Sequence, residues 1–475
     1  MLQSTPHQAA YTVIPSLKSF VADLPSALRH GDVKQLLAWY TDAKTDPLHP
    51  ALLASVFFSV AVWVVSEITG NVSQVDRLWT TLPLMYSAHF TFHPWITGQV
   101  KHAYEIDHRI LLVFALQCAW SARLTYQSAR RGFLDPRSED YRWPIVRRSM
   151  PTVAFKLLNL VFIAFIQNFL LLAAEAPVYL LMTQSLPSYG HTSILARLKP
   201  YQAATKSVPL NVADVLLAGA FLTTLVLEMR ADNQQQAFQR LKHGALDKQK
   251  KGQPLTEEEK KAVERGFVAD GLWAWSRHPN FACEQTTWWL LYAFTVLPFL
   301  PITESFTSHP LSTLTNLLTP TALLPASKRA YVYASKNIPT LDYILTILLH
   351  PFLYIRASLP HLTNSDFLRS EAARAKLEAL AAYREFKNDE GQTWNYSIVS
   401  PITMSLLFYS STILTEKISS GKYPLYKAYQ ARVAKFWPVQ TPLKGLYLAL
   451  TGGRRGRVER QIWGADGQGR KIKQL

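Results

Sequence analysis

Four polar side chains with clear chemical potential stand at the start of an apolar segment in the stretch GLWAWSRHPNFACEQTTWW: Arg277, His278, Asn280 and Glu284. The proline between them, Pro279, predicts a helix that begins there, because a proline at the first helical position loses no hydrogen bond. The free N–H groups and positive dipole end of such a helix favour an anion, and Arg277 adds a positive charge. This pattern is typical of a ligand site.

Glu284 lies inside an otherwise apolar run, where an acid is costly unless it faces a polar cavity or a partner. On a helix that starts at Pro279, Asn280 and Glu284 share one face by their four-residue spacing. We therefore interpret this helix as one wall of a ligand site at a membrane surface. The alternative is that Arg277 and His278 are interfacial residues and that a neighbour satisfies Glu284.

Two further polar groups stand at the ends of other apolar segments. Glu228 and Asp232 follow one such segment at a spacing that places both on one helical face. Near the C-terminus, tyrosines and basic residues follow the last apolar segment, a pattern that alone fits an aromatic belt with lysine and arginine at the interface. The remaining candidates in these two groups are Gln234, Glu416, Tyr426, Tyr429, Arg432 and Lys435.

The elements that must position these residues are long apolar segments. A bilayer-spanning helix needs about 20 apolar residues. Segments of that kind occur at 50–68, 78–97, 109–126, 153–174, 209–229, 282–302 and 398–415, with a weaker one at 339–356 that we assign to the interface. The sequence therefore predicts an all-α integral membrane protein with about seven transmembrane helices and helical inserts outside the membrane.

The chain is strongly basic, with a net charge of +17 over its 475 residues. The basic residues crowd beside apolar segments, which favours contact with a lipid bilayer over nucleic acid. The link 123–156 carries eight lysines and arginines and the link 230–278 carries ten, so both links are predicted to be cytoplasmic, as is the C-terminus. The only cysteines, Cys118 and Cys283, lie in apolar segments and indicate neither a disulfide framework nor a metal site.

The same features divide the chain into regions. Within the bundle, Thr256 and Glu259 predict a capping box that opens a short helix. Lys471 and Lys473, near the C-terminus, resemble the dilysine retrieval signal of endoplasmic reticulum membrane proteins. The predicted regions are a polar lead-in at 1–47, a bundle of six helices at 48–302 with a charged cytoplasmic insert at 243–266, an insert at 303–393 with an interfacial helix at 339–356 and a further helix at 364–388, the last helix and its tail at 394–440, and a basic tail at 441–475.

Taken together, three ordered motifs resemble one family. They are SRHPN followed by Glu284, the E-x-x-x-D-x-Q of residues 228–234, and the tail YPLYKAYQARVAKFWP. They resemble the steroid 5-alpha-reductase-like superfamily, in particular its branch of uncharacterised bacterial and fungal membrane proteins. The upstream pieces VDRLW and EDYRW are similar to the same branch. The resemblance covers most of 50–302 and 394–440.

The resemblance implies a seven-helix bundle that holds NADPH in a cavity open to the cytoplasm and passes hydride to an activated carbon–carbon double bond of a lipid. A lipid-like small molecule and the bilayer are the partners it implies. By position, Glu228, Asp232, Asn280 and Glu284 would contact the cofactor. The tail residues Tyr426, Tyr429 and Arg432 would close over it. One departure is that the family's Asn-Tyr-Phe-Gly-Glu run carries Phe281 and Cys283 here, where Cys283 replaces a glycine.

The chemistry of this cofactor suits the residue types. Its phosphates favour arginine in bidentate contact and helix N-termini, so Arg277, Arg432 and Lys435 are candidates. The carboxylates would instead meet ribose hydroxyls, the carboxamide or arginines. No Gly-x-Gly-x-x-Gly lies between a strand and a helix, so a soluble dinucleotide-binding fold is not indicated.

Reduction of an enone also needs an acid that polarises the carbonyl. The candidates are Glu67, Asp76 and Tyr86, and Asp76 is preferred because it lies in the family-like VDRLW. The alternative is that Asp76 pairs with Arg77 or caps the second span.

Two other classes of function remain open from the sequence. Isoprenylcysteine and phospholipid methyltransferases share the Arg-His-Pro element and a similar tail. They bind S-adenosylmethionine, and the same carboxylates could contact its cationic sulfonium. A non-catalytic membrane protein on the same fold is the other, because of Phe281 and Cys283. Retention of NADPH or of S-adenosylmethionine, but not of both, would separate a reductase from a methyltransferase.

Overall fold

The computed structural model describes residues 13–24, 31–185, 210–299, 395–451 and 453–464 of the chain. The described residues form helices and contain no β-strand, apart from one isolated parallel bridge between Ser276 and Ala434. The prediction of an all-α protein is therefore confirmed for this part of the chain.

Four helices of the described residues are long and apolar enough to cross a membrane. Many of their large apolar side chains are exposed, among them Phe57, Val65, Leu216 and Leu406, as expected of surfaces that face lipid. These features indicate an integral membrane protein. The four are α5 (Leu48–Thr69), the continuous helix Thr152–Ala174, α14 (Val212–Lys250), and Tyr396–Lys422, which includes α23 (Val399–Lys422).

The helix Thr152–Ala174 is built from three parts that follow one another without a break. A π-helical stretch, Asn159–Ile166, separates α10 (Thr152–Leu158) from α11 (Gln167–Ala174). The wider π-helical winding is rare and is often found at functional sites. Here it places the buried Asn159 amide beside Ser66 and Glu67 of α5.

Three other predicted spans are helical but do not meet the same length and composition. The helices α7 (Leu82–Ile96) and α16 (Pro279–Ala293) have 15 residues each, fewer than the ~20 that a straight span needs. The helix α8 (His108–Arg130) has 23 residues but buries charged and amide side chains. Four candidate spans are therefore shown, and the count of about seven stays a prediction.

The helix α14 continues far beyond its predicted apolar segment, 209–229. Its 39 residues correspond to about 58 Å, roughly twice the hydrocarbon thickness of a bilayer. The charged stretch 243–266 comprises the last turns of α14, a turn, and α15 (Glu257–Arg265). The predicted capping box is confirmed, since Thr256 Oγ1 accepts from the Glu259 N–H and the Glu259 carboxylate accepts from the Thr256 N–H.

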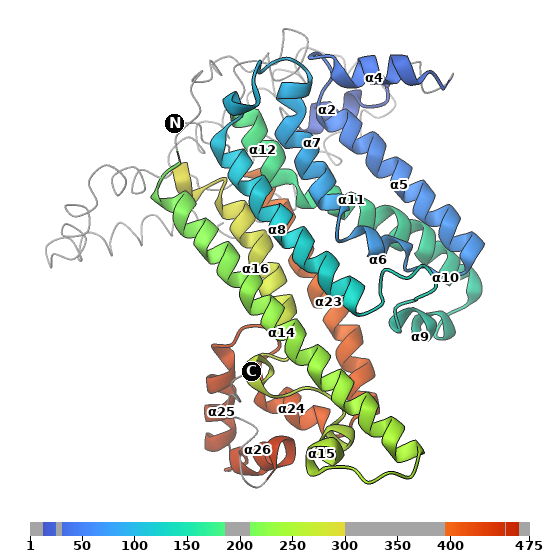
Figure 1. Ribbon diagram of the computed structural model, residues 1–475, viewed down its shortest axis with the longest axis vertical. Coiled ribbons are helices and arrows are strands. Elements are labelled where there is room, and N and C mark those ends of the chain that lie inside the picture. The colour runs from blue at the N-terminus through green and yellow to red at the C-terminus, as the bar shows by residue number, and fades with distance from the viewer. Residues whose placement is uncertain (1–12, 25–30, 186–209, 300–394, 452, 465–475) are drawn as a thin grey trace, which may run out of the picture.

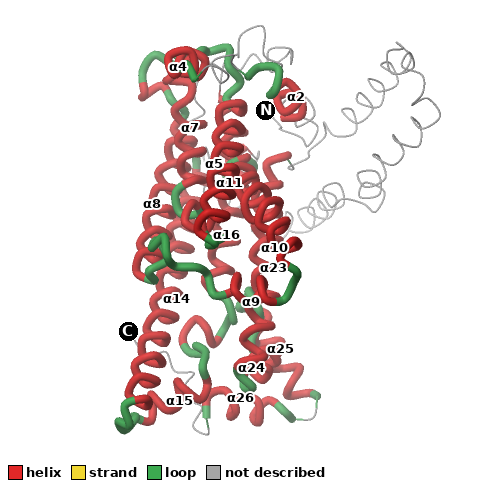
Figure 2. Tube along the Cα trace, turned by 90° about the vertical axis from the view of Figure 1, so that its right-hand side faces the viewer, coloured by secondary structure: helices red, strands yellow, loops and turns green. Residues whose placement is uncertain are grey.

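The described helices form a bundle and a smaller group at one end, which we call the head (Figure 1). The helices α14 and α23 run from the bundle into the head, and the turned view shows the same division (Figure 2). At the opposite end lie α2 (Val13–Ser19) and α4 (Val33–Thr41). The head consists of α15, α24 (Tyr426–Arg432), α25 (Gln440–Leu450) and α26 (Arg455–Trp463).

The main apolar core lies inside the bundle, where several helices contribute to it. Its largest buried side chains include Tyr86 of α7, Trp120 of α8, Phe221 of α14 and Trp288 of α16. The rings of Trp120 and Trp288 meet edge to face, with their centroids 5.3 Å apart. This core fixes α8 against α16, which matters for the polar site described below. The helix α12 (Ala176–Ser185) completes this part of the bundle.

Several predicted features lie outside the described residues. They are the interfacial helix at 339–356, the helix at 364–388, almost all of the insert 303–393, and the terminal lysines Lys471 and Lys473.

Candidate functional site

Arg123 is the centre of a buried group of charges that three helices bring together. Its guanidinium, on α8, lies 2.9 Å from Glu228 and 3.1 Å from Asp232, both on α14. The carboxylate of Glu284 on α16 lies 3.3 Å away. All four side chains are almost fully buried. Removing charges from water is costly, so this arrangement persists only because each charge meets an opposite one.

Two further residues complete what we call the Arg123 cluster. Arg131 contacts Asp232 Oδ1 at 2.6 Å, and the Asn280 amide donates to the same oxygen at 3.2 Å. The four-residue spacing of Glu228 and Asp232 places both on one face of α14, as predicted. The cluster comprises Arg123, Arg131, Glu228, Asp232, Asn280 and Glu284. Three carboxyl groups and two guanidiniums thus share this buried site.

Indole groups of the bundle core hold the Glu284 carboxylate in place. Trp120 Nε1 donates to both of its oxygens, at 3.0 and 3.2 Å, and Trp288 Nε1 donates at 3.2 Å. Together with the contact from Arg123, these hydrogen bonds give both oxygens of the Glu284 carboxylate a partner. Glu228 differs, because its Oε2 atom is buried and makes no hydrogen bond within the described part of the chain. A buried acceptor without a donor is rare, and it suits a ligand hydroxyl or amide.

A second group of charges, which we call the Glu416 cluster, surrounds the end of α23. Arg277 meets the Glu416 carboxylate in a bidentate contact at 2.7 and 3.1 Å. His278 Nε2 lies 3.0 Å from Glu416, and the Gln430 amide donates to it at 3.1 Å. Burial lowers the pKa of His278, so the neutral ring donates from Nε2. The cluster comprises Arg277, His278, Glu416 and Gln430.

Backbone contacts fasten Arg277 and His278 to the segment that follows α24. The Arg277 N–H donates to the Ala434 carbonyl at 2.8 Å, and the His278 N–H donates to the Lys435 carbonyl at 3.1 Å. The Arg277 guanidinium also donates to the carbonyls of Gln430 and Val433. The helix α16 then begins at Pro279, as the sequence predicts.

The segment 271–284 contributes residues to both clusters and also contacts the helices that support them. On one side, Gln234 Oε1 accepts from the Leu272 N–H at 3.0 Å, and Trp273 Nε1 donates to the Ala231 carbonyl of α14 at 3.0 Å. On the other side, the Tyr429 hydroxyl of α24 donates to the Trp273 carbonyl at 2.5 Å. The polar residues predicted from three distant parts of the chain therefore converge on two adjacent clusters.

The other candidates from the C-terminal tail, Tyr426 and Arg432, contact other residues of the protein. Arg432 is buried and pairs with Glu459 of α26 at 2.7 Å, and it donates to the Thr441 carbonyl at 2.9 Å. The Tyr426 ring packs edge to face on Phe267, with their centroids 5.0 Å apart. These contacts join α24 to the rest of the head. A role for Tyr426 and Arg432 at a cofactor stays a prediction.

The three candidate acids lie apart from one another. Asp76, on α6 (Gln74–Leu78), accepts a hydrogen bond from Trp143 Nε1 at 3.3 Å. Burial and the neighbouring Asp140 carboxylate raise the pKa of Asp76. Glu67 accepts from the Asn159 amide at 3.0 Å, whereas Tyr86 lies in the bundle core.

Pairing with Arg77 is one of the two alternatives for Asp76, and Arg77 forms no ion pair with Asp76 among the described residues. Its guanidinium donates instead to the carbonyls of Asp135, Pro136 and Ser138. These bonds fix the loop after α8 against α6. The Tyr86 hydroxyl is buried and has no hydrogen-bond partner within the described residues. Which of the three acids takes part in chemistry stays a prediction.

The sequence interpretation missed several buried polar residues. Arg123 was grouped only with the basic link that it begins, and Glu175 was not singled out. Glu175 is fully buried and accepts from the Gln117 amide at 2.7 and 2.9 Å, while Ser87 donates to the same glutamine. A single acid between two apolar helices was the signal that could have identified Glu175.

Another buried ion pair lies at the other end of the bundle. Arg109 of α8 meets Asp214 of α14 in a bidentate contact at 2.7 and 2.8 Å, and both side chains are buried. Asp214 also accepts from the Asn211 N–H and so closes the capping box of α14. This pair joins the same two helices as the Arg123 cluster, but far from it along α14.

The fold and the two clusters define a helical membrane protein with a buried polar site where its bundle meets its head. The chain belongs to the family described as DUF1295, proteins of unknown function, whose model matches residues 62–323, more than half of the chain. All six residues of the Arg123 cluster lie within the matched range, whereas Glu416 lies beyond it.

One relative comes from Schizosaccharomyces pombe (strain 972) and is itself an uncharacterised protein. It is 35% identical to this chain over 252 residues, which are 53% of this chain and 65% of the relative. The chain thus spans somewhat less than two thirds of that protein. No solved structure matches the chain.

Proposed function

We propose that this protein is an NADPH-dependent membrane oxidoreductase that reduces an activated carbon–carbon double bond of a lipid, such as a steroid-like molecule or a fatty enone. The resemblance of its three motifs to the steroid 5-alpha-reductase-like superfamily supports the proposal. The gathering of those motifs around one segment supports it further, because residues 228–234, 277–284 and 426–435 are the parts that the resemblance assigns to the cofactor.

The single observation that carries the proposal is the Arg123 cluster with its unsatisfied acceptor. Glu228 Oε2 is buried without a donor among the described residues, in the same cluster as Asn280. A ribose hydroxyl or the nicotinamide carboxamide supplies the missing kind of donor. The residues at this point therefore fit the sugar and amide portion of NADPH.

The phosphates of the cofactor require cations that are free to meet them. Arg277 and Arg432 are already paired with Glu416 and Glu459. Lys435 makes no ion pair within the described part of the chain, and its ammonium lies over the Tyr409 ring at 4.3 Å. Lys435 is thus the candidate that phosphate can reach without an exchange of partners, whereas Arg277 would have to share its guanidinium with Glu416.

When bound, NADPH would supply the hydride; the protein residues supply position and charge. Asn280 would orient a polar edge of the ligand through its amide, and Glu228 would accept from it. Trp120 and Trp288 keep the Glu284 carboxylate fixed and exclude water from its surroundings. In the proposed reaction Asp76, Glu67 or Tyr86 would donate to the carbonyl of the substrate.

The test is a titration of the purified full-length chain in detergent with NADPH, followed by intrinsic fluorescence. We expect saturable binding by the wild type and at least about tenfold weaker binding by Glu228→Gln, since a hydrogen bond to a charged group contributes roughly 1.5–3 kcal/mol. The matched control is Asp214→Asn, which changes another buried carboxylate that pairs with an arginine far from the cluster. Absence of saturable binding, or equal loss in both variants, would contradict the proposal.

A methyltransferase that uses S-adenosylmethionine is the second candidate, and one observation favours it. The gathering of three acidic side chains in the Arg123 cluster suits a cationic sulfonium more than a neutral dihydronicotinamide. The same titration with S-adenosylmethionine separates the two. Binding of neither compound would support a non-catalytic role.

Cellular location and orientation belong to the same proposal. We propose the endoplasmic reticulum membrane, with the head and the C-terminus in the cytoplasm. The orientation is supported by the basic link between α8 and α10, which carries Arg137, Arg142, Arg147 and Arg148 beside apolar helices. The choice of membrane is supported by the resemblance of Lys471 and Lys473 to a dilysine retrieval signal.

A further inference from the structure

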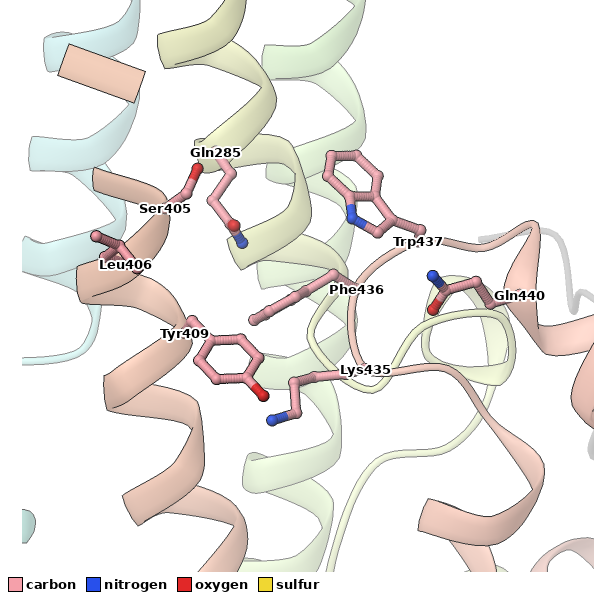
Figure 3. Close-up of a pocket in the computed structure, with 8 residues that line it drawn as sticks. All are labelled: Gln285, Ser405, Leu406, Tyr409, Lys435, Phe436, Trp437 and Gln440. Atoms are coloured by element: carbon pink, nitrogen blue, oxygen red, sulfur yellow. The ribbon is translucent and has the colours of Figure 1, made fainter. Parts of the chain in front are cut away.

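A pocket of about 480 Å³ lies between α16, α23 and the segment 435–440, on the outside of the bundle (Figure 3). Its apolar walls come from Leu406, Tyr409, Phe436 and Trp437. The Tyr409 and Phe436 rings stand 6.4 Å apart. This pocket faces away from the Arg123 cluster, because Gln285 points to the α23 side of α16 whereas Glu284 faces α8.

Two polar side chains with unused capacity line the same pocket. Gln285 is only 5% exposed, and its amide points into the pocket (Figure 3). Its Nε2 donates to the Phe281 carbonyl at 3.0 Å, while Oε1 makes no hydrogen bond with the described residues. The Lys435 ammonium lies over the Tyr409 ring and has no acidic partner within the described part of the chain. The pocket thus offers one acceptor and one cation above an apolar floor.

The position of the pocket points to a lipid. It lies along the first half of α23, where Leu406 and Tyr409 are exposed on a helix that is long and apolar enough to cross a membrane. Trp437, also exposed, lies between α24 and α25 and lines the other side of the pocket. Tryptophan, tyrosine and lysine together are typical of the level at which lipid head groups meet the acyl chains.

We propose that this pocket binds one anionic phospholipid from the leaflet on the side of the head. Its phosphate meets Lys435, and its acyl chain follows Leu406 and the ring of Trp437. A donor on the head group, such as the ammonium of phosphatidylserine, satisfies Gln285 Oε1. The pocket does not involve the Arg123 cluster, but it shares Lys435 with the phosphate contact proposed above for NADPH, so the lipid and the cofactor phosphate would compete for this ammonium. The lipid titration below is therefore carried out without NADPH, so that its outcome is separate from that of the cofactor titration.

The experiment uses the full-length chain in detergent, titrated with phosphatidylserine or phosphatidylcholine and examined by native mass spectrometry. We expect one phosphatidylserine to bind in preference to phosphatidylcholine. Lys435→Gln should weaken phosphatidylserine about fivefold, equivalent to ~1 kcal/mol for one basic residue beside an anionic lipid. Lys422→Gln is the matched control, because Lys422 also lies over a tyrosine ring, that of Tyr423, but outside the pocket.

A second variant guards against a simple failure to fold. Gln285→Leu removes the free acceptor and should reduce the preference for phosphatidylserine while leaving the binding of phosphatidylcholine unchanged. Thermal melting of each variant reports whether it is folded. Equal affinity for the two lipids, or equal loss in Lys422→Gln and Lys435→Gln, would overturn the proposal. Displacement of phosphatidylserine by millimolar inorganic phosphate would assign the site to free phosphate and would also overturn it.

Discussion

At the scale of single residues, Arg123 has the largest energetic role in the site. Its guanidinium contacts three buried carboxyl groups, whereas the other cation of the cluster, Arg131, contacts only Asp232. Hydrogen bonds from two indoles support only one of these acids. The site is therefore stable as a whole and sensitive to the loss of its centre.

Replacement of Arg123 by methionine should destabilise the protein by roughly 3–5 kcal/mol, because it leaves uncompensated charge in the bundle. Thermal melting in detergent measures the effect. Arg130→Met is the control on the same helix, since Arg130 contacts Asn233 at the surface and no carboxylate within the described residues. A melting temperature of Arg123→Met equal to that of the control would show that the carboxylates are not held by this cation.

Lys444 gives the protein a dependence on pH that can be measured. Its ammonium donates to the carbonyls of Gln430 and Val433, and burial, with the neighbouring Arg277, lowers its pKa to about 8 from 10.5. The unfolded chain therefore holds more protons between these two values, so the free energy of unfolding rises with pH across that window. Below about pH 8 this contribution is absent.

The measurement compares the wild type with Lys444→Met at pH 7.5 and at pH 10. We expect the stability difference between them to shift in favour of the wild type at the higher pH, because only the wild type carries the titrating amine. A difference that is constant or moves the other way would contradict a lowered pKa of Lys444.

Local spacing predicted part of the site at this scale and not the rest. The face shared by Glu228 and Asp232, and the start of α16 at Pro279, follow from helical geometry and from the missing N–H of proline. The place of Arg123 depends on how α8 packs against α14, about a hundred residues along the chain. No periodicity within α8 distinguishes Arg123 from Arg130.

At the scale of elements, the segment that enters α16 depends on one glycine. Gly271 has a φ of +62°, and a Cβ atom there would lie 2.4 Å from Gln234 Nε2. The left-handed conformation suits glycine alone among common residues. Gln234 accepts a hydrogen bond from the Leu272 N–H, so a side chain at position 271 would disturb the contact between this segment and α14.

Gly271→Ala should therefore lower the stability by more than about 1 kcal/mol, since both the backbone angle and the neighbouring amide oppose it. The matched change is Gly219→Ala in the interior of α14, where a Cβ atom meets nothing within 4 Å. That change should raise the stability by about 0.5–1 kcal/mol, because alanine favours the helix. Thermal melting of both variants checks the opposite signs, and a shared sign would contradict the assigned role of Gly271.

Among the elements, apolar composition predicted α5, the helix Thr152–Ala174 and α23 well. It did not predict the length of α14, because the polar half of that helix is stabilised by contacts with α15 and the segment 271–274 and carries no apolar signal. Likewise, α7 and α16 are shorter than the apolar segments predicted at 78–97 and 282–302.

At the scale of the whole molecule, the bundle separates two ends that should lie on opposite sides of a bilayer. The helix α4 lies at one end, and the C-terminal end of α14 lies at the other (Figure 1). Single cysteines at exposed positions in these elements, Gln35→Cys and Lys250→Cys, test the separation. The background replaces Cys118 by serine and Cys283 by alanine.

In sealed vesicles, a membrane-impermeant maleimide should label one of the two cysteines and spare the other, because about 58 Å of helix exceeds the thickness of a bilayer. Detergent should then expose both, which serves as the control for sealing. Labelling of both positions in intact vesicles would contradict a membrane-crossing bundle.

The unbroken course of α14 has a consequence for how the gene can change. Each residue of an α-helix turns the chain by about 100° and advances it by ~1.5 Å. One codon inserted between Asp232 and Phe238 would therefore rotate every later side chain of α14 about the helix axis, whereas Glu228 would keep its orientation. The contacts of Phe238 and Lys242 with the head would be lost together. Natural variants should accordingly keep this interval at constant length, and insertions should gather instead after Lys250, where the helix has ended.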